Sequence, residues 1–365
     1  MSIDALKMTR RADSPLTANG ATGPPSPTPP GEAPSGIGAR SVTPLQRLQR
    51  ILHAHPAISP ALILVVTCIV FSTLNPRFAE PGTVSLMVQQ TAVIAALAVG
   101  QTLIILTAGI DLSVGAAAIL SMMVMARYGS EQGLSGPVTL LLGLAVAVAT
   151  GALNGFLVTK LKLPPFIVTL GTLSVFTAIT LIYTGGQSVQ QVAMPDLLSW
   201  TGEVHQIGDF RITNGVLLCI ALYLIVGYAL SQTAWGRHVY AVGDDPEAAR
   251  LAGIRTPRVL FSVYVAAGIV YGVAAWILIG RAGAASPNAI GDANLETITA
   301  VVIGGTSLFG GRGGVVGTLL GALIVQAFAL GLSLAGVDDQ YRLLAVGALV
   351  VAAVSVDQWI RKVRS

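Results

Sequence analysis

The chain carries few charged residues for its length. Among its 365 residues, 21 are Lys or Arg and 17 are Asp or Glu, which is 10% of the sequence, whereas soluble domains carry about 25%. The mean hydropathy is +0.74. This composition excludes a soluble globular protein, and apolar stretches long enough to cross a bilayer recur after residue 56. Because strand-like alternation is missing, we expect an all-α integral membrane protein.

The signatures of catalysis and of nucleotide or metal binding are missing as well. No Gly-Lys pair occurs, so the glycine-rich run at 310–314 does not end as a phosphate-binding loop does. No catalytic constellation or nucleophile elbow is present, and the four His residues lack metal-ligand spacing. The two Cys residues fall in apolar stretches, as small core residues do. We therefore expect no enzyme, and no metal, cofactor or nucleic acid bound by this chain.

Ten apolar segments are candidates for membrane helices. With both termini in the cytoplasm they place thirteen Lys and Arg residues near the inner face and five outside, as the positive-inside rule demands. The eighth segment is short for a full crossing, which is typical of a broken or re-entrant helix. The ten segments are Ala57 to Leu74, Val84 to Thr107, Leu112 to Ala126, Val138 to Thr159, Phe166 to Thr184, Thr213 to Ser231, Val259 to Gly280, Leu295 to Leu308, Val315 to Ala335 and Tyr341 to Val356.

Two segments precede these spans. Residues 1–44 hold eight of the 19 prolines and cannot bury enough apolar area to fold, which predicts a disordered cytoplasmic tail. Residues 45–56 place apolar side chains on one helical face and Arg47 and Arg50 on another, which predicts a short helix lying on the anionic inner leaflet. Residues 57–365 then form the transmembrane domain.

A polar island at residues 232–258 interrupts the apolar pattern. Asp245 can cap the free N–H groups of a helix, Pro246 is tolerated at its first position, and Glu247 complements its dipole. Gly253 can adopt the left-handed conformation that ends a helix. The pattern predicts a two-turn cytoplasmic helix, rich in alanine, whose backbone another protein could approach closely. An ordinary capped helix between two spans remains an alternative.

Four polar residues are candidates for a translocation path. Burying the charge of Asp111 costs about 2.5 to 3.5 kcal/mol on insertion scales unless it is satisfied. Asp111 therefore either caps the helix that follows or faces a path together with Ser113. Asn154 lies inside a span, where an interhelical hydrogen bond is the commoner role. Glu296 either complements the dipole of its helix or lines an outer vestibule.

Three glycines recur every four residues at Gly313, Gly317 and Gly321. This spacing would align them on one helical face and let a neighbouring helix approach closely. We expect helix packing there, not ligand contact.

The run Glu247-Ala248-Ala249-x-x-x-Gly253 resembles the coupling motif of ABC importer permeases. Three further segments resemble the ribose-type branch of that family, namely Leu106 to Leu120, Lys160 to Phe176 and Leu295 to Ile324. Together they cover most of the chain from about residue 80 onward. The resemblance implies an ABC importer permease fold in a bacterial inner membrane, with the island as its coupling loop.

The resemblance also implies partners and a cargo. Two permease copies would form a homodimer in the lipid bilayer, with the path between them. An ABC ATPase subunit, which holds the ATP and Mg, would grip the coupling loop, and a solute-binding protein would deliver a monosaccharide such as ribose or fructose outside. Branched-chain amino acids remain an alternative cargo. An ion-coupled secondary transporter is a further alternative, although only Asp111 and Glu296 are candidates for buried acids.

Overall fold

The computed structural model describes residues 58–190 and 193–338, with eight scattered residues between 340 and 355. The predicted tail at 1–44, the predicted interfacial helix at 45–56 and most of the predicted helix from Tyr341 to Val356 lie outside the described residues. Every described residue belongs to one compact unit, which spans Leu48–Ser365.

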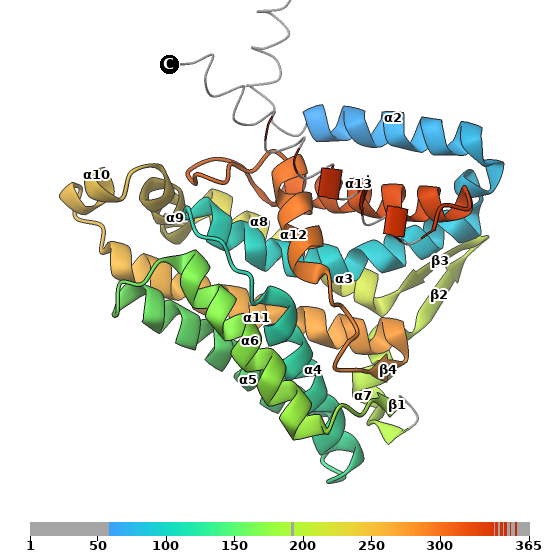
Figure 1. Ribbon diagram of the computed structural model, residues 1–365, viewed down its shortest axis with the longest axis horizontal. Coiled ribbons are helices and arrows are strands. Elements are labelled where there is room, and N and C mark those ends of the chain that lie inside the picture. Colours follow the sequence, from blue (N-terminus) through green and yellow to red (C-terminus); the bar gives the residue numbers. More distant parts are fainter. Residues whose placement is uncertain are drawn as a thin grey trace, which may run out of the picture. The chain divides into compact units, whose positions relative to one another are not determined.

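Apolar helices make up most of the described chain (Figure 1). Among the described residues, six helices are long and apolar enough to cross a membrane, and three shorter apolar helices stand where the first, third and eighth spans were predicted. A helical membrane protein is thereby confirmed, while ten crossings and cytoplasmic termini stay predictions. The long helices are α3 (Pro81–Leu106), α5 (Gly136–Thr159), α6 (Pro165–Thr184), α8 (Asn214–Gln232), α11 (Thr256–Ala282) and α13 (Val315–Leu334). The shorter ones are α2 (Ile58–Leu74), α4 (Val114–Ser130) and α12 (Ala293–Ile303).

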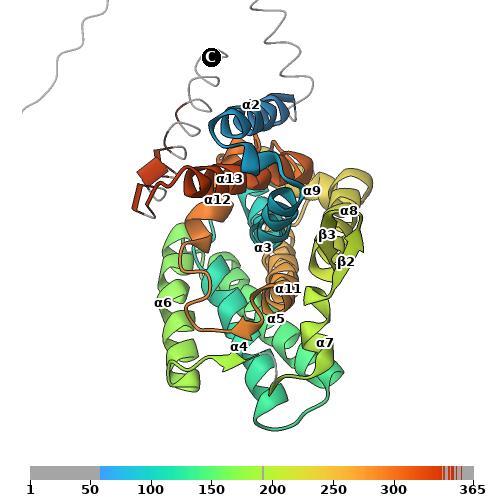
Figure 2. The ribbon, with the colours of Figure 1, turned by 90° about the vertical axis from the view of Figure 1, so that its right-hand side faces the viewer.

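Helix α3 forms the core of the bundle and packs against α8, α11, α12 and α13. Every residue from Ala92 to Leu106 is buried. Small residues make this possible, because a Cβ on Gly100 would collide with the ring of Tyr271 on α11. Helix α6 differs, since it lies at the edge of the bundle (Figure 2). Only 28% of an apolar 18-residue stretch of this helix is buried.

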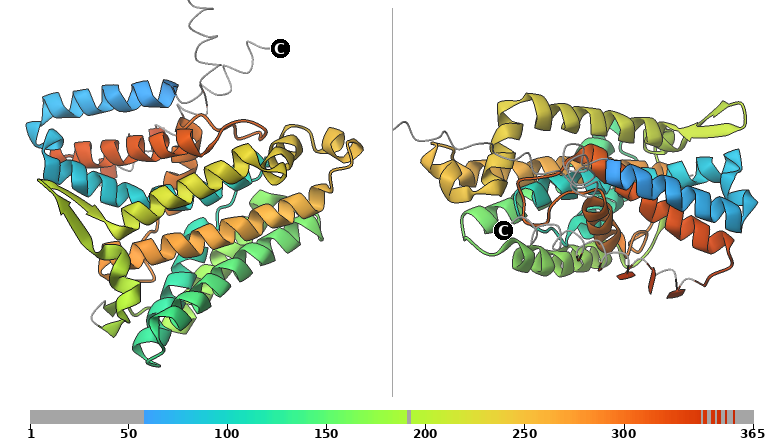
Figure 3. Two further views of the ribbon diagram at one scale, coloured as in Figure 1. Left: turned by 180° about the vertical axis from the view of Figure 1, so that it is seen from behind. Right: turned by 90° about the horizontal axis from the view of Figure 1, so that it is seen from above.

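Short polar elements connect the long helices at one end. A hairpin of β2 (Val204–Ile207) and β3 (Phe210–Thr213) pairs antiparallel, with Gly208 in its turn at a φ of 63°. The hairpin lies at the end of the long helices opposite to the polar island (Figures 1 and 3). The other short elements are η1 (Pro76–Ala79), β1 (Val189–Gln190), α7 (Asp196–Ser199), η3 (Trp200–Gly202) and β4 (Ala284–Ala285), which pairs with β1.

The polar island folds as two helices before α11 begins. Helix α9 (Ala234–Asp244) follows α8 directly, and the Thr233 hydroxyl caps it by accepting a hydrogen bond from the Gly236 N–H at 3.1 Å. Helix α10 (Pro246–Leu251) comes next and stands out from the bundle at its tip (Figures 1 and 3). The island thus presents a short exposed helix on a base formed by α9.

Candidate functional site

The capping chemistry of α10 follows the sequence pattern closely. The Asp245 carboxylate accepts hydrogen bonds from the N–H groups of Glu247 at 2.9 Å and Ala248 at 3.0 Å. Pro246 occupies the first turn, where its missing N–H costs nothing. Gly253 follows the helix end with a φ of 85°, in the left-handed region that glycine adopts most readily.

The outward surface of α10 is small and partly charged. Arg250 pairs with Glu247 at 3.0 Å, and both side chains are largely exposed, so this pair adds little to stability. Ala249 is buried against the base, whereas Ala248 is exposed and Leu251 is 81% exposed. A solvent-facing leucine beside alanines is a surface that another protein can cover.

A buried polar cluster forms around Asp111, in the linker between α3 and α4. One carboxylate oxygen of Asp111 accepts hydrogen bonds from the N–H and the hydroxyl of Ser113, at 2.7 and 2.6 Å. The other accepts from the Tyr271 hydroxyl on α11, at 3.1 Å. The Asn154 side-chain amide on α5 donates to the Ser113 hydroxyl at 2.8 Å. Three of the four predicted path residues therefore meet, and Asp111 satisfies the backbone N–H of the residue that caps α4.

Two buried atoms of this region have no hydrogen-bond partner among the described residues. They are the side-chain oxygen of Asn154 and the hydroxyl of Tyr264. Tyr264 lies seven residues before Tyr271 on α11, so both side chains share one helical face. Sequence reasoning missed both tyrosines, although two polar aromatics at this spacing inside one span were a usable signal.

Glu296 stands apart from the cluster. It lies half-buried in the first turn of α12, and no hydrogen bond joins it to Asp111, Ser113 or Asn154 in the described part of the chain. The nearby Asn294 instead links α12 to α4, because its side-chain oxygen accepts a hydrogen bond from the Gly115 N–H at 3.0 Å. This contact fixes the N-terminal ends of the two short helices against each other.

The glycine series at the start of α13 needs one correction. Cβ atoms on Gly317 and Gly321 would collide with the backbone carbonyls of Gly304 and Ala300, so these glycines lie where α13 packs against α12. Gly313 does not share that face, because α13 begins at Val315 and Gly313 lies before it with a φ of 123°. Glycine is needed at position 313 for the backbone conformation of the turn before α13, and not for a contact between helices.

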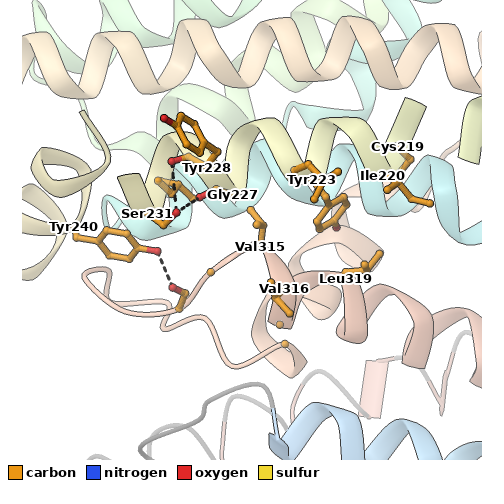
Figure 4. Close-up of a pocket in the computed structure, with 16 residues that line it drawn as sticks. Cys219, Ile220, Tyr223, Gly227, Tyr228, Ser231, Tyr240, Val315, Val316 and Leu319 are labelled. Carbon is orange, nitrogen blue, oxygen red and sulfur yellow. Dashed lines mark hydrogen bonds between the residues drawn. The ribbon is translucent and has the colours of Figure 1, made fainter. Parts of the chain in front are cut away.

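An apolar groove of about 560 Å³ lies between α8 and the start of α13 (Figure 4). The hydroxyl of Tyr240 on α9 closes one end by donating to the carbonyl of Gly313 at 2.9 Å. Burial raises the pKa of this hydroxyl above its usual value, so it stays protonated and keeps donating. The residues from α8 that line the groove include Cys219, Tyr223, Gly227 and Tyr228.

No group of three His, Cys, Asp or Glu side chains that could hold a metal ion occurs within residues 58–190 and 193–338 or the few described beyond them. The polar groups that the structure does bring together are a carboxylate, hydroxyls and an amide. Through the Asn154 and Tyr271 side chains, these hydrogen bonds join the linker before α4 to α5 and α11.

Comparison with known proteins gives the site its context. A family described as a branched-chain amino acid transport system permease component matches residues 83–354. A fructose import permease of Rhizobium meliloti is 46% identical over 89% of this chain and 91% of its own length. A ribose import permease of Bacillus subtilis (strain 168) is 37% identical over 86% of this chain and 97% of its own. A D-allose transport system permease of Escherichia coli (strain K12) is 33% identical over 82% and 91%. These matches confirm the family membership that the motifs indicated.

Proposed function

The chain belongs to the family of branched-chain amino acid transport system permease components, and on that premise we propose that it imports a monosaccharide. It is a multi-pass inner-membrane transport subunit, not an enzyme. One observation carries the sugar assignment, namely 46% identity to a fructose import permease over 89% of the chain. The ribose and D-allose relatives handle sugars of similar size. Fructose or ribose is therefore the expected cargo.

Import of this kind is driven by ATP hydrolysis on a separate ATPase subunit, which binds the ATP together with Mg. We propose that this subunit docks on α10. The capped helix stands out from the bundle, its Leu251 side chain is 81% exposed, and the segment Asp245 to Gly253 contains the run that resembles the coupling motif. A partner that changes conformation while bound there can move α9 and α11, because these helices come directly before and after α10 in the chain.

A solute-binding protein and a second permease copy complete the proposed importer. With α10 on the cytoplasmic side, the binding protein would dock at the β2–β3 hairpin, which exposes the polar residues His205 and Gln206 beside the apolar residues Val204 and Ile207. The edge position of α6, with exposed apolar residues such as Ile179 and Ile182, supports a helix that faces a second copy or lipid. A homodimer embedded in lipid is the proposed assembly.

The predicted path residues divide into two groups. Asp111, Ser113 and Asn154 form bonds with one another and with Tyr271, and Asp111 is only 1% exposed. We propose that they orient α4, α5 and α11 around the path. Glu296 is more accessible and has no hydrogen-bonded partner among the described side chains, which suits a residue that lines the path or its outer opening.

Uptake in proteoliposomes tests the proposal. The permease would be reconstituted with the ATPase and the solute-binding protein of its own system, and uptake of labelled fructose, ribose and leucine would be compared with and without internal ATP. We expect ATP-dependent uptake of a monosaccharide and none of leucine. ATP-dependent leucine uptake alone would favour the cargo in the family's description, and uptake driven by an ion gradient without ATP would refute the importer.

Thermal shift of the solute-binding protein gives an independent measurement. Screening it against pentoses, hexoses and branched-chain amino acids should show stabilisation by one sugar class, because a ligand that binds only the folded state raises the melting temperature. The class that stabilises it should match the class taken up by the vesicles.

A further inference from the structure

Three backbone segments meet directly beneath α10. A Cβ on Gly243, at the end of α9, would collide with the carbonyl oxygen of Leu106, at the end of α3. The same Leu106 carbonyl accepts a hydrogen bond from the Gly311 N–H at 3.0 Å. A Cβ on Gly310 would lie 2.6 Å from the carbonyl oxygen of Gly243. We call Gly243, Gly310 and Gly311 the glycine junction.

Only glycine fits each position of the glycine junction. Gly310 and Gly311 have φ angles of 83° and 70°, which side chains other than glycine seldom adopt. A Cβ on Gly311 would also lie 2.8 Å from the Cα atom of Asp244, the residue that precedes the cap of α10. The contacts are therefore backbone against backbone, with no side chain between them that could rotate away.

Further bonds tie the glycine junction to its surroundings. The Tyr240 hydroxyl on α9 donates to the Gly313 carbonyl (Figure 4), which holds the 304–314 loop to α9. Beside the junction, Ala108 has a φ of 59°, a conformation that a residue with a Cβ keeps only where the surrounding structure enforces it. A Cβ on Gly310 would lie 3.0 Å from the Cβ of Ala108.

The linker that begins at Ala108 leads to the buried cluster. Three residues later it reaches Asp111, which is bonded to α11 through Tyr271. On the way, the carbonyl of Ile110 accepts a hydrogen bond from the Thr169 hydroxyl on α6 at 3.0 Å. A continuous set of close contacts therefore runs from the base of α10 to α4, α6 and α11.

We propose that the glycine junction makes the base of α10, the end of α3 and the 304–314 loop move as one unit during transport. The proposal rests on the proposed docking of an ATPase on α10. Packed backbones have low compressibility, so a displacement of Asp244 is passed on to Leu106 and Gly311. The linker then carries it to Asp111 and to α6. Gly243, Gly310 and Gly311 are positioning residues, since they act through the helices that they join.

The test measures sugar taken up per ATP hydrolysed in proteoliposomes that contain the permease, its ATPase and its binding protein. Gly243→Ala pushes the Leu106 carbonyl away, and Gly82→Ala at the other end of α3, with nothing within 4 Å of its Cβ, is the matched control. Tyr240→Phe deletes one hydrogen bond without changing the backbone. Tyr228→Phe is its control, because Tyr228 lines the same groove and is 66% exposed.

We expect Tyr240→Phe to lower the uptake per ATP about three- to tenfold, as the loss of one hydrogen bond allows, and Gly243→Ala to lower it further. Co-purification of the ATPase should stay at the wild-type level, and both controls should match wild type.

An unchanged ratio of sugar taken up to ATP hydrolysed in Tyr240→Phe overturns the proposal, even if Gly243→Ala fails to fold. The proposal is also overturned if the variants bind less ATPase but the complexes that still form take up the normal amount of sugar per ATP, because Gly243 and Tyr240 would then only shape the docking surface. Failure of the docking proposal itself would differ, since α10 variants would then bind the ATPase normally.

Discussion

Removing the cap of α10 should weaken ATPase binding by a predictable amount. Asp245→Ala deletes two hydrogen bonds, to the N–H groups of Glu247 and Ala248. Loss of such a cap costs about 1 kcal/mol of helix stability. Helix α10 has six residues, and helices shorter than about 12 residues are marginal without outside support. If only the ordered helix is recognised, the apparent Kd should rise by up to about fivefold, because 1 kcal/mol changes the equilibrium constant between the ordered and disordered forms of α10 by that factor.

Titration of the purified ATPase onto the permease in lipid nanodiscs measures this Kd. Asp245→Asn is the matched control, since its side-chain oxygen caps a helix as well as a carboxylate does and its Kd should stay within about twofold of wild type. Membrane insertion of both variants should be normal, because Asp245 is exposed and lies outside the spans. An unchanged Kd in Asp245→Ala would refute the recognition of an ordered α10. An equal loss in both variants would show that the charge, and not the cap, is recognised.

Three further predictions test other parts of the structure. Gly253→Val should abolish uptake and ATPase co-purification while leaving membrane insertion intact, because a β-branched residue cannot readily hold a φ of 85°; uptake and pull-down assays check this. Tyr271→Phe should lower stability by about 1 to 3 kcal/mol, since the buried carboxylate of Asp111 loses a donor; thermal unfolding in detergent should show it. Gly321→Ala should lower the free energy of unfolding by about 1 to 3 kcal/mol, because the added methyl group overpacks the contact with α12. In the same thermal unfolding measurement Gly171→Ala, which has nothing within 4 Å of its Cβ, should unfold like wild type.

Local chemistry made α10 predictable from the sequence. The run from Asp245 to Gly253 contains its own start and stop signals, and neither depends on tertiary contacts. Helix α9 was not predicted, although its buried residues Gly236, Val239, Val242 and Gly243 recur at helical spacing. The β2–β3 hairpin was not predicted either, because strands of four residues carry too little alternation to stand out.

Long-range contacts explain what the sequence did not reveal about the buried cluster. Asp111 was predicted to cap a helix or face a path, and the carboxylate does satisfy the N–H of Ser113. Its bond to Tyr271 joins residues 160 positions apart, for which no local pattern exists. Gly313 shows the converse error: its regular spacing with Gly317 and Gly321 indicated one helical face, but the helix starts two residues later.

The shortness of α12 explains why the loop that follows it is so fully bonded. Its eleven residues rise about 16 Å, roughly half of the hydrocarbon thickness of about 30 Å. Residues 304–314 must therefore provide any remaining depth without a helix, and backbone groups at that depth need partners within the protein. The Ser307 N–H donates to the Arg312 carbonyl at 2.9 Å, and the Gly314 N–H donates to the Thr306 hydroxyl at 3.2 Å. A further bond, from the Gly311 N–H to the Leu106 carbonyl, meets the same requirement by using a free carbonyl at the end of α3. The need to satisfy a non-helical backbone is thus what brings the 304–314 loop against α3 and, with it, against the base of α10.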